Sequence, residues 1–255
     1  MHKTYGFLAL TLYGLIFVST PAISQEEAAE KAAPAPAAVS CSIEDRPCIL
    51  KTLEETASTI ENASWRDQTL RELAKTYAFE GDLDRAISFI EQIKTPDTKA
   101  MTIRGIGMAA ADNNLTPEKY KTLFTSLRAE AEKIKHPPSY AIALTYIAMA
   151  QAFAGDDEGA WATAADMQND ALRHKAYGET AEIQAEKGNY EDALKSIAFI
   201  DSEAYKNKSY ELVCKILADQ DLLGPALKSA ENITNSYKKA EALQYVLDKQ
   251  KPREK

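Results

Sequence analysis

The sequence predicts an all-α fold, an α-solenoid of about five antiparallel helix pairs with a half unit at each end. Apolar residues recur with the helical period of about 3.6, and no stretch alternates over the length of a strand. A repeated alanine, at Ala160, Ala193 and Ala226, returns with a constant period of 33. The 255 residues include only ten Gly and ten Pro, which argues against a turn-rich all-β fold and against low-complexity disorder.

Residues 1–24 have the pattern of a signal peptide and are not expected to belong to the fold. A basic start at Lys3 precedes an apolar run from Tyr5 to Val18, and the small residues Ala22 and Ser24 suit a cleavage site. An uncleaved membrane anchor is the alternative, but a spanning helix needs about 20 apolar residues, and this run is shorter. We therefore expect residues 1–24 to be cleaved and the mature chain to have no membrane span.

Residues 25–40 are rich in Ala, Glu and Pro and are typical of a semi-extended tether, because they offer almost nothing to bury. The folded domain is expected over residues 41–255. A signal peptide implies an exported protein, which would be periplasmic if the source is a Gram-negative bacterium and secreted otherwise.

Export brings the three cysteines into oxidising surroundings, where thiols can pair. Cys41 and Cys48 flank a short loop, and a bridge between them would contribute about 2–3 kcal/mol in the chain-entropy model. Two free thiols are the alternative. Cys214 falls at a small-residue position of a predicted helix, so we expect a buried, inert thiol there rather than a nucleophile.

The helix pairs can be followed along the chain from residue 45, where Asp45 and Pro47 begin a leading half unit. In each later pair, one apolar stripe ends seven positions after the repeated alanine, and a second stripe follows a short connection. Gly-Asp or Gly-Asn at 81–82, 155–156 and 188–189 marks the end of one helix and the start of the next. Each pair is therefore predicted to consist of two antiparallel helices of roughly 12–16 residues. The residues that end the first stripe are Ile93, Met167, Ile200 and Ile233.

Mostly basic residues recur at the same position of successive repeats, and their spacing shows where one repeat carries an insertion. Four of the five intervals in this row are 33, whereas the interval from Lys99 to Tyr140 is 41. The extra eight positions fall within 115–138, where Thr116-Pro117 is expected to begin a longer helix and Pro137-Pro138 to end it. A basic residue near a helix start opposes the helix dipole, so the row either pairs with acids of the adjacent unit or meets an acidic partner. Its members are Arg66, Lys99, Tyr140, Arg173, Lys206 and Lys239.

Candidate catalytic chemistry is sparse. The chain has three His and three Cys without a His-x-x-x-His or Cys-x-x-Cys pair, so no metal site is expected. Gly105 and Gly107 lie within a predicted helix, where they favour close packing over phosphate binding. The formal net charge of −8 argues against a nucleic-acid binder. We expect no catalytic residue, no cofactor and no metal.

Ala74, Tyr77, Gly81 and Ala86 have the spacing of a small residue, an aromatic residue, a glycine and an alanine. In this pattern the chain resembles the tetratricopeptide repeat family over about residues 48–250. It departs from the family in two ways, because the period is 33 rather than about 34 and because glutamine replaces the aromatic residue at 151 and 184. The resemblance implies a protein-binding scaffold in which the first helix of each pair lines the concave side.

The resemblance also implies that a partner contacts those positions of the first helices that the packing stripe leaves free. Met108, Met149 and Phe153 are expected to form one apolar patch with basic residues on one side of it. We expect an extended or helical partner segment with some acidic residues, which apolar anchors hold and cations orient. The alternative is that these side chains pack on a neighbouring helix. The candidate residues are Arg71, Lys75, Arg104, Met108, Met149, Phe153, Lys175, Glu182, Lys208, Glu211 and Lys215.

The sequence therefore predicts an exported protein-binding scaffold or adaptor of the cell envelope, with a protein or peptide partner and no nucleic acid. The alternative is an enzyme, or an enzyme-accessory subunit, with a cryptic site in the solenoid. A nucleophile and a base that converge beside a deep pocket would favour the enzyme. The sequence leaves open whether the chain forms a homo-oligomer.

Overall fold

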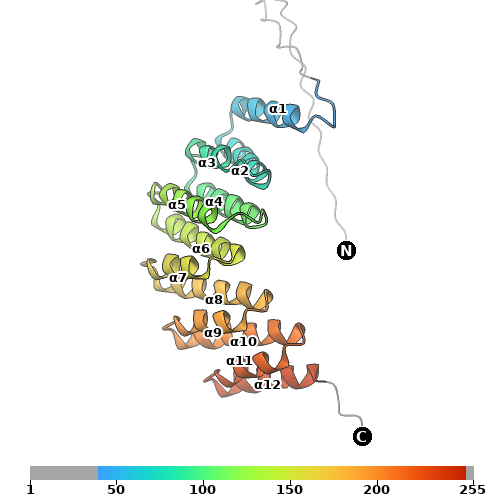
Figure 1. The fold of residues 1–255 in the computed structure, drawn as a ribbon. Coiled ribbons are helices and arrows are strands. Elements are labelled where there is room, and N and C mark those ends of the chain that lie inside the picture. The colour runs from blue at the N-terminus through green and yellow to red at the C-terminus, as the bar shows by residue number, and fades with distance from the viewer. Residues whose placement is uncertain (1–39, 251–255) are drawn as a thin grey trace, which may run out of the picture. The chain divides into compact units, whose positions relative to one another are not determined.

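The structure is a computed structural model that describes residues 40–250 (Figure 1). These residues form twelve α-helices and include no strand, so the all-α prediction is confirmed for the described part of the chain. The predicted signal peptide and the predicted tether, apart from Ser40, lie outside the described residues. Among residues 40–250, no helix has the length and apolar content that crossing a bilayer requires.

The helices follow one another along the chain with short connections. They are α1 (Arg46–Thr59), α2 (Ala63–Phe79), α3 (Leu83–Gln92), α4 (Pro96–Ala111), α5 (Pro117–Glu132), α6 (Pro137–Ala154), α7 (Asp157–Ala165), α8 (Asp170–Glu186), α9 (Tyr190–Ala198), α10 (Glu203–Asp219), α11 (Leu223–Glu231) and α12 (Ser236–Lys249).

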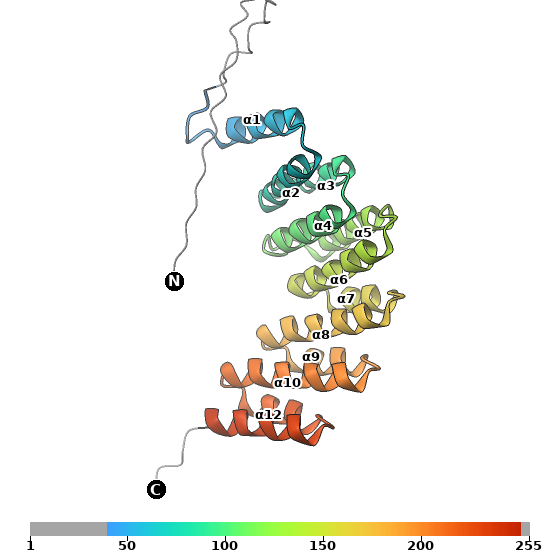
Figure 2. The same ribbon diagram turned by 180° about the vertical axis from the view of Figure 1, so that it is seen from behind.

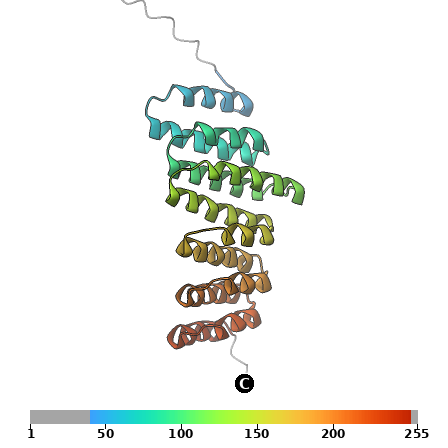
Figure 3. The same cartoon turned by 90° about the vertical axis from the view of Figure 1, so that its left-hand side faces the viewer.

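The even-numbered helices from α2 to α12 lie side by side in chain order, and each contacts the next (Figure 2). They begin at positions 63, 96, 137, 170, 203 and 236, so four of the five intervals are 33 and the second is 41. Residues at the same distance from these starts therefore occupy equivalent positions on successive helices. The successive helix pairs are also seen in a view turned by 90° (Figure 3).

Helices α3, α7, α9 and α11 are shorter than predicted, with ten residues in α3 and nine in each of the others. Their longer partners α2, α6, α8 and α10 have 17 or 18 residues. The prediction of similar helices of roughly 12–16 residues is therefore wrong for most pairs. The reason is that the last apolar residue of the short helix's stripe belongs to the connection and is nevertheless fully buried. These residues are Ile93, Met167, Ile200 and Ile233.

Helix α5 carries the insertion and has 16 residues, which confirms the predicted longer helix. The Thr116 side chain accepts a hydrogen bond from the Lys119 amide, and Pro117 occupies the first turn. The end of this helix was predicted wrongly, because α5 stops at Glu132 and Pro137 begins α6 instead. A proline is tolerated in the first turn of a helix because no intrahelical hydrogen bond needs its missing N–H there.

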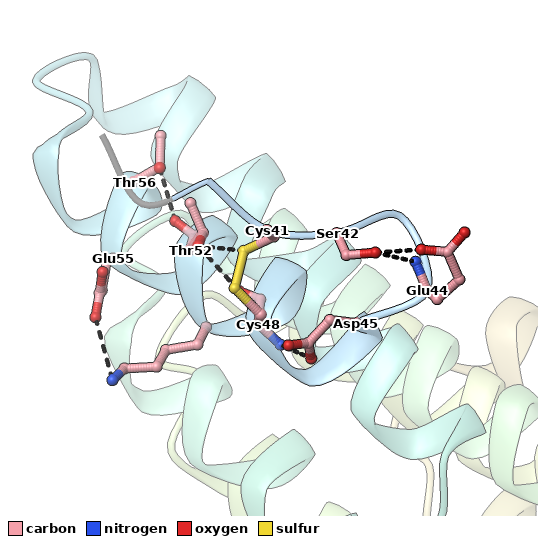
Figure 4. The surroundings of a disulfide bond; sticks show 9 residues. Cys41, Ser42, Glu44, Asp45, Cys48, Thr52, Glu55 and Thr56 are labelled. Carbon is pink, nitrogen blue, oxygen red and sulfur yellow. Dashed lines mark hydrogen bonds and ion pairs between the residues drawn. A yellow bond between two sulfur atoms is a disulfide. The ribbon is translucent and has the colours of Figure 1, made fainter. Parts of the chain in front are cut away.

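The start of α1 is fixed by a cap and by a disulfide (Figure 4). The Asp45 carboxylate accepts a hydrogen bond from the Cys48 amide, and the sulfur atoms of Cys41 and Cys48 lie 2.00 Å apart in a disulfide bond. Cys214 is buried and free. Burial raises the pKa of the Cys214 thiol to about 11, which keeps it protonated and unreactive.

Thiol titration of the unfolded, unreduced protein is expected to find one thiol, that of Cys214. A Cys41→Ser, Cys48→Ser variant is expected to lose about 2–3 kcal/mol of unfolding free energy in urea, because the closed loop no longer restricts the unfolded chain. Reduction of the wild type should lower its unfolding free energy to that of this variant. A Cys214→Ser protein, which keeps the disulfide, is the control. A titre of three thiols would show that the bridge is absent.

The two glutamines that replace the aromatic residue form buried hydrogen bonds between paired helices. In the α2–α3 pair, the rings of Tyr77 and Phe89 stack with their centroids 5.6 Å apart. In the α8–α9 pair, Gln184 Oε1 accepts a hydrogen bond from the Ser196 hydroxyl at 2.6 Å. In the α6–α7 pair, Gln151 Oε1 accepts a hydrogen bond from the Thr163 hydroxyl. The α6–α7 and α8–α9 pairs thus have a satisfied polar contact where the α2–α3 pair has an aromatic one.

Candidate partner-binding face

The candidate residues of the first three even-numbered helices occupy equivalent positions. Lys75, Met108 and Met149 each lie twelve positions after the first residue of α2, α4 or α6. Arg71 and Arg104 lie eight positions after the starts of α2 and α4. Because α2 contacts α4 and α4 contacts α6, these rows run across the three helices on one face.

Two adjoining hollows lie on this face and bring five of the eleven candidate residues together. The first has a volume of about 330 Å³ and is lined by Arg71, Lys75, Arg104 and Met108, among others. The second has a volume of about 530 Å³, and Lys75, Met108 and Phe153 line it. Glu72, Lys75 and Met108 are common to both hollows. Met149 lines neither hollow and is half-buried against the core, so the apolar patch is smaller than predicted.

The cations of this face differ in how far their charge is neutralised. The Arg71 guanidinium lies 2.8 Å from a carboxylate oxygen of Glu72. The Arg104 guanidinium lies 5.2 Å from the centre of the Tyr146 ring, which holds its side chain without cancelling its charge. Lys75 is exposed, and neither Lys75 nor Arg104 forms an ion pair within residues 40–250. Two positive charges thus remain available beside the hollows.

The candidates on α8 and α10 lie apart from both hollows. Lys215 is 2.6 Å from Glu211, whose carboxylate also lies 2.9 Å from Lys238. These hydrogen bonds lower the pKa of Glu211. Lys175 is 4.0 Å from Glu179 on the same helix, and Lys208 is exposed. The basic residues of this half of the face are therefore mostly matched by acids.

Phe79 lines the second hollow but was not among the candidate residues predicted from the sequence. It ends α2, and the residue is 64% exposed. Both Phe79 and Phe153 lie sixteen positions after the start of their helices, so they are equivalent. The repeat spacing could have indicated Phe79, because the equivalent residue Phe153 was predicted to bind the partner. Arg46 and Asp112 also line this hollow and were not predicted.

Three of the five basic residues in the row donate hydrogen bonds to backbone carbonyls at or just after the end of the preceding helix, rather than pairing mainly with acids of the adjacent unit. The Arg66 side chain donates a hydrogen bond to the Ile60 carbonyl, and the Arg173 side chain donates one to the Met167 carbonyl at 3.1 Å. The Lys206 side chain donates one to the Ala198 carbonyl. The negative end of each preceding helix dipole thereby meets a positive charge. Only Arg173 also meets an acid of the next unit, Asp201 at 3.6 Å, so the ladder of ion pairs, one of the two alternatives for this row, is not formed within the described residues.

One serine, one histidine and one aspartate come together, but not in the order that nucleophilic catalysis needs. Ser139 Oγ lies 2.6 Å from His136 Nδ1 and donates to the carboxylate of Asp97. The serine therefore stands between the other two, whereas an activated nucleophile needs the histidine in the middle. Ser139 is also fully buried. These contacts join the starts of α4 and α6.

Comparison with known proteins finds no matching family model, no similar curated protein and no similar solved structure. Residues 40–250 contain no group of three or more His, Cys, Asp or Glu side chains arranged to hold a metal ion. The described part of the chain is an all-helical protein with a hollowed face that is both cationic and apolar.

Proposed function

We propose that the helices form an α-solenoid similar to tetratricopeptide repeats and that the protein is an exported binding scaffold or adaptor of the cell envelope. The helix starts support the repeat, since intervals of 33 recur on both sides of the single interval of 41. A signal-like start and a disulfide support export. The partner is a protein segment that lies on the face of α2, α4 and α6.

The observation that carries this proposal is the pair of adjoining hollows. Phe79 and Phe153 offer exposed or half-buried aromatic surface, and Met108 offers a flexible side chain between them. Such apolar anchors supply most of the affinity in protein interfaces. Lys75 and Arg104 carry positive charge without an acidic partner among the described residues, so they suit acidic side chains of the segment. Charges of this kind mainly set orientation and encounter rate.

Replacing Arg71, Lys75 and Arg104 together with Glu is expected to abolish retention of the partner that the wild type captures from its native envelope. The reason is that the two available positive charges, Lys75 and Arg104, become repulsive beside the hollows, and that Arg71→Glu leaves Glu72 without its cation. Partners would be identified by mass spectrometry after affinity capture, and retention of each would be compared between the two proteins. The melting temperature should stay nearly unchanged, because the three side chains are at the surface.

A matched control variant carries Lys119→Glu, Lys121→Glu and Lys135→Glu, which gives the same change in net charge on and beside α5. All three of these lysines are exposed. This control should retain the partner as the wild type does. If the Arg71, Lys75 and Arg104 variant retains every partner as strongly as the control does, at low and at physiological salt, the assigned face is wrong.

A further inference from the structure

Charge is ordered along the face of the even-numbered helices. Three rows run across α2, α4, α6, α8 and α10, at eight, twelve and sixteen positions after each helix start, and Thr145 and Gly178 of the first row are buried. The rows hold two cations on α2, one cation and one anion on α4, no charge on α6, two carboxylates on α8, and two carboxylates with one cation on α10. The residues are Arg71, Lys75 and Phe79; Arg104, Met108 and Asp112; Thr145, Met149 and Phe153; Gly178, Glu182 and Glu186; Glu211, Lys215 and Asp219.

Glu182 marks the negative end of this order, opposite the free cations of α2 and α4. Its side chain is half-buried on α8, and no hydrogen bond or ion pair reaches its carboxylate within residues 40–250. Glu179 and Glu186 act on Glu182 with the same charge, and the positive charge of Lys208 acts against theirs. A half-buried carboxylate without a bonded cation is costly. A basic side chain from outside would remove this cost.

We propose that the partner segment crosses the face with one polarity, its carboxylates over α2 and α4, its apolar side chains over Met108 and Phe153, and a Lys or Arg side chain over Glu182. This inference rests on the proposed function and adds the chemistry of the partner. The opposite polarity would place like charges together at both ends, which disfavours it.

The required length of the segment follows from helix packing. Neighbouring packed helices lie about 8–10 Å apart, so the three steps from α2 to α8 span about 24–30 Å. An extended chain advances about 3.3 Å per residue, so eight or nine residues, roughly, cover this distance. A 12-residue peptide is therefore long enough to place acidic, apolar and basic groups over their respective helices.

The test uses two synthetic peptides of about 12 residues, long enough for the span of eight or nine derived above, each with a fluorescent label that does not titrate near neutral pH. They have identical composition and no histidine. One carries a Glu block, a Leu and Phe block and a Lys block in that order, and its isomer alternates the same charges. We expect the segregated peptide to bind the mature protein at least about tenfold more tightly at physiological salt, measured by fluorescence anisotropy. Glu182→Lys should abolish most of this difference. Glu231→Lys, an exposed change on α11, is the matched control and should leave it unchanged.

The pH dependence gives a second readout. Burial, together with Glu179 and Glu186, raises the pKa of Glu182 to about 7. Binding of the segregated peptide should therefore weaken when the pH falls from about 8 to about 6, because the carboxylate that pairs with the peptide's lysine becomes protonated. In Glu182→Gln this pH dependence should be lost, whereas it should persist in Glu231→Lys.

Equal affinities for the two isomers would overturn the polarity while leaving the hollowed face as the proposed site. Failure of both isomers to bind would also overturn the polarity, because the charge order then recruits no segment. The proposed function is decided separately by partner retention in the Arg71, Lys75 and Arg104 variant, so the two failures can be told apart.

Discussion

Gly107→Leu is expected to lower the free energy of unfolding by about 3 kcal/mol or to prevent folding. Gly107 lies on α4 and is buried against α6. A Cβ atom added there would lie 2.7 Å from the Cβ of Ala150 and 3.6 Å from a methyl carbon of Leu127. The nearest atom is attached directly to the backbone of α6, so the two helices must separate to admit a larger residue. Urea denaturation followed by circular dichroism would measure the loss.

Gly105→Ala is the matched control, two positions earlier on the same helix. Its added Cβ would lie 3.6 Å from the Cβ of Lys75, which is ordinary contact. This variant should gain up to about 1 kcal/mol, because alanine has the higher helix propensity. If Gly107→Leu proves as stable as Gly105→Ala, the close approach of α4 and α6 is wrong.

Much of the helical arrangement could be predicted because local chemistry determines it. Ala160, Ala193 and Ala226 are fully buried at equivalent positions of α7, α9 and α11. Glycine at 81, 155 and 188 adopts φ of 86°, 81° and 78°, a left-handed conformation that ends the helix at little cost. The constant spacing of such signals is visible in the sequence because each one acts within its own unit.

Helix length could not be predicted in the same way. Ile93 continues the apolar stripe of α3 but lies after the end of the helix. A periodic pattern records which side chains are buried and does not distinguish the last helical turn from a connection that packs into the same core. The hydrogen bonds of Arg66 and Arg173 to backbone carbonyls could not be predicted either, because every residue has a carbonyl and the sequence does not show which one lies near.

The candidate face was predicted in part. The equivalence of Lys75, Met108 and Met149 follows from the repeat spacing, and two of these three residues line the hollows. Met149 does not, because its burial depends on how α6 packs against its neighbours, which no spacing reveals. The exposure of Phe79 has the same origin, since an aromatic residue in the last turn of a helix is compatible with burial or exposure.

Asp67→Ala is the second change with a large expected effect, a loss of about 3 kcal/mol of unfolding free energy. Asp67 lies on α2 and is fully buried. Its carboxylate accepts hydrogen bonds from the amide of Lys94, at 3.1 and 3.2 Å, and from the amide of Thr95, at 2.8 Å. These amides belong to the connection between α3 and α4. Alanine would leave them unsatisfied in a buried place and detach the connection from α2.

Asp67→Asn separates the loss of these hydrogen bonds from the loss of volume. Asn207 holds the equivalent position on α10, where its side-chain oxygen accepts a hydrogen bond from the Thr234 amide at 2.8 Å. An asparagine at 67 can therefore keep one acceptor in place, and we expect it to cost only about 1 kcal/mol. Amide exchange at Lys94 and Thr95 should quicken strongly in the alanine variant and weakly in the asparagine variant. Equal stability and equal exchange in the two variants would show that the carboxylate does not hold this connection.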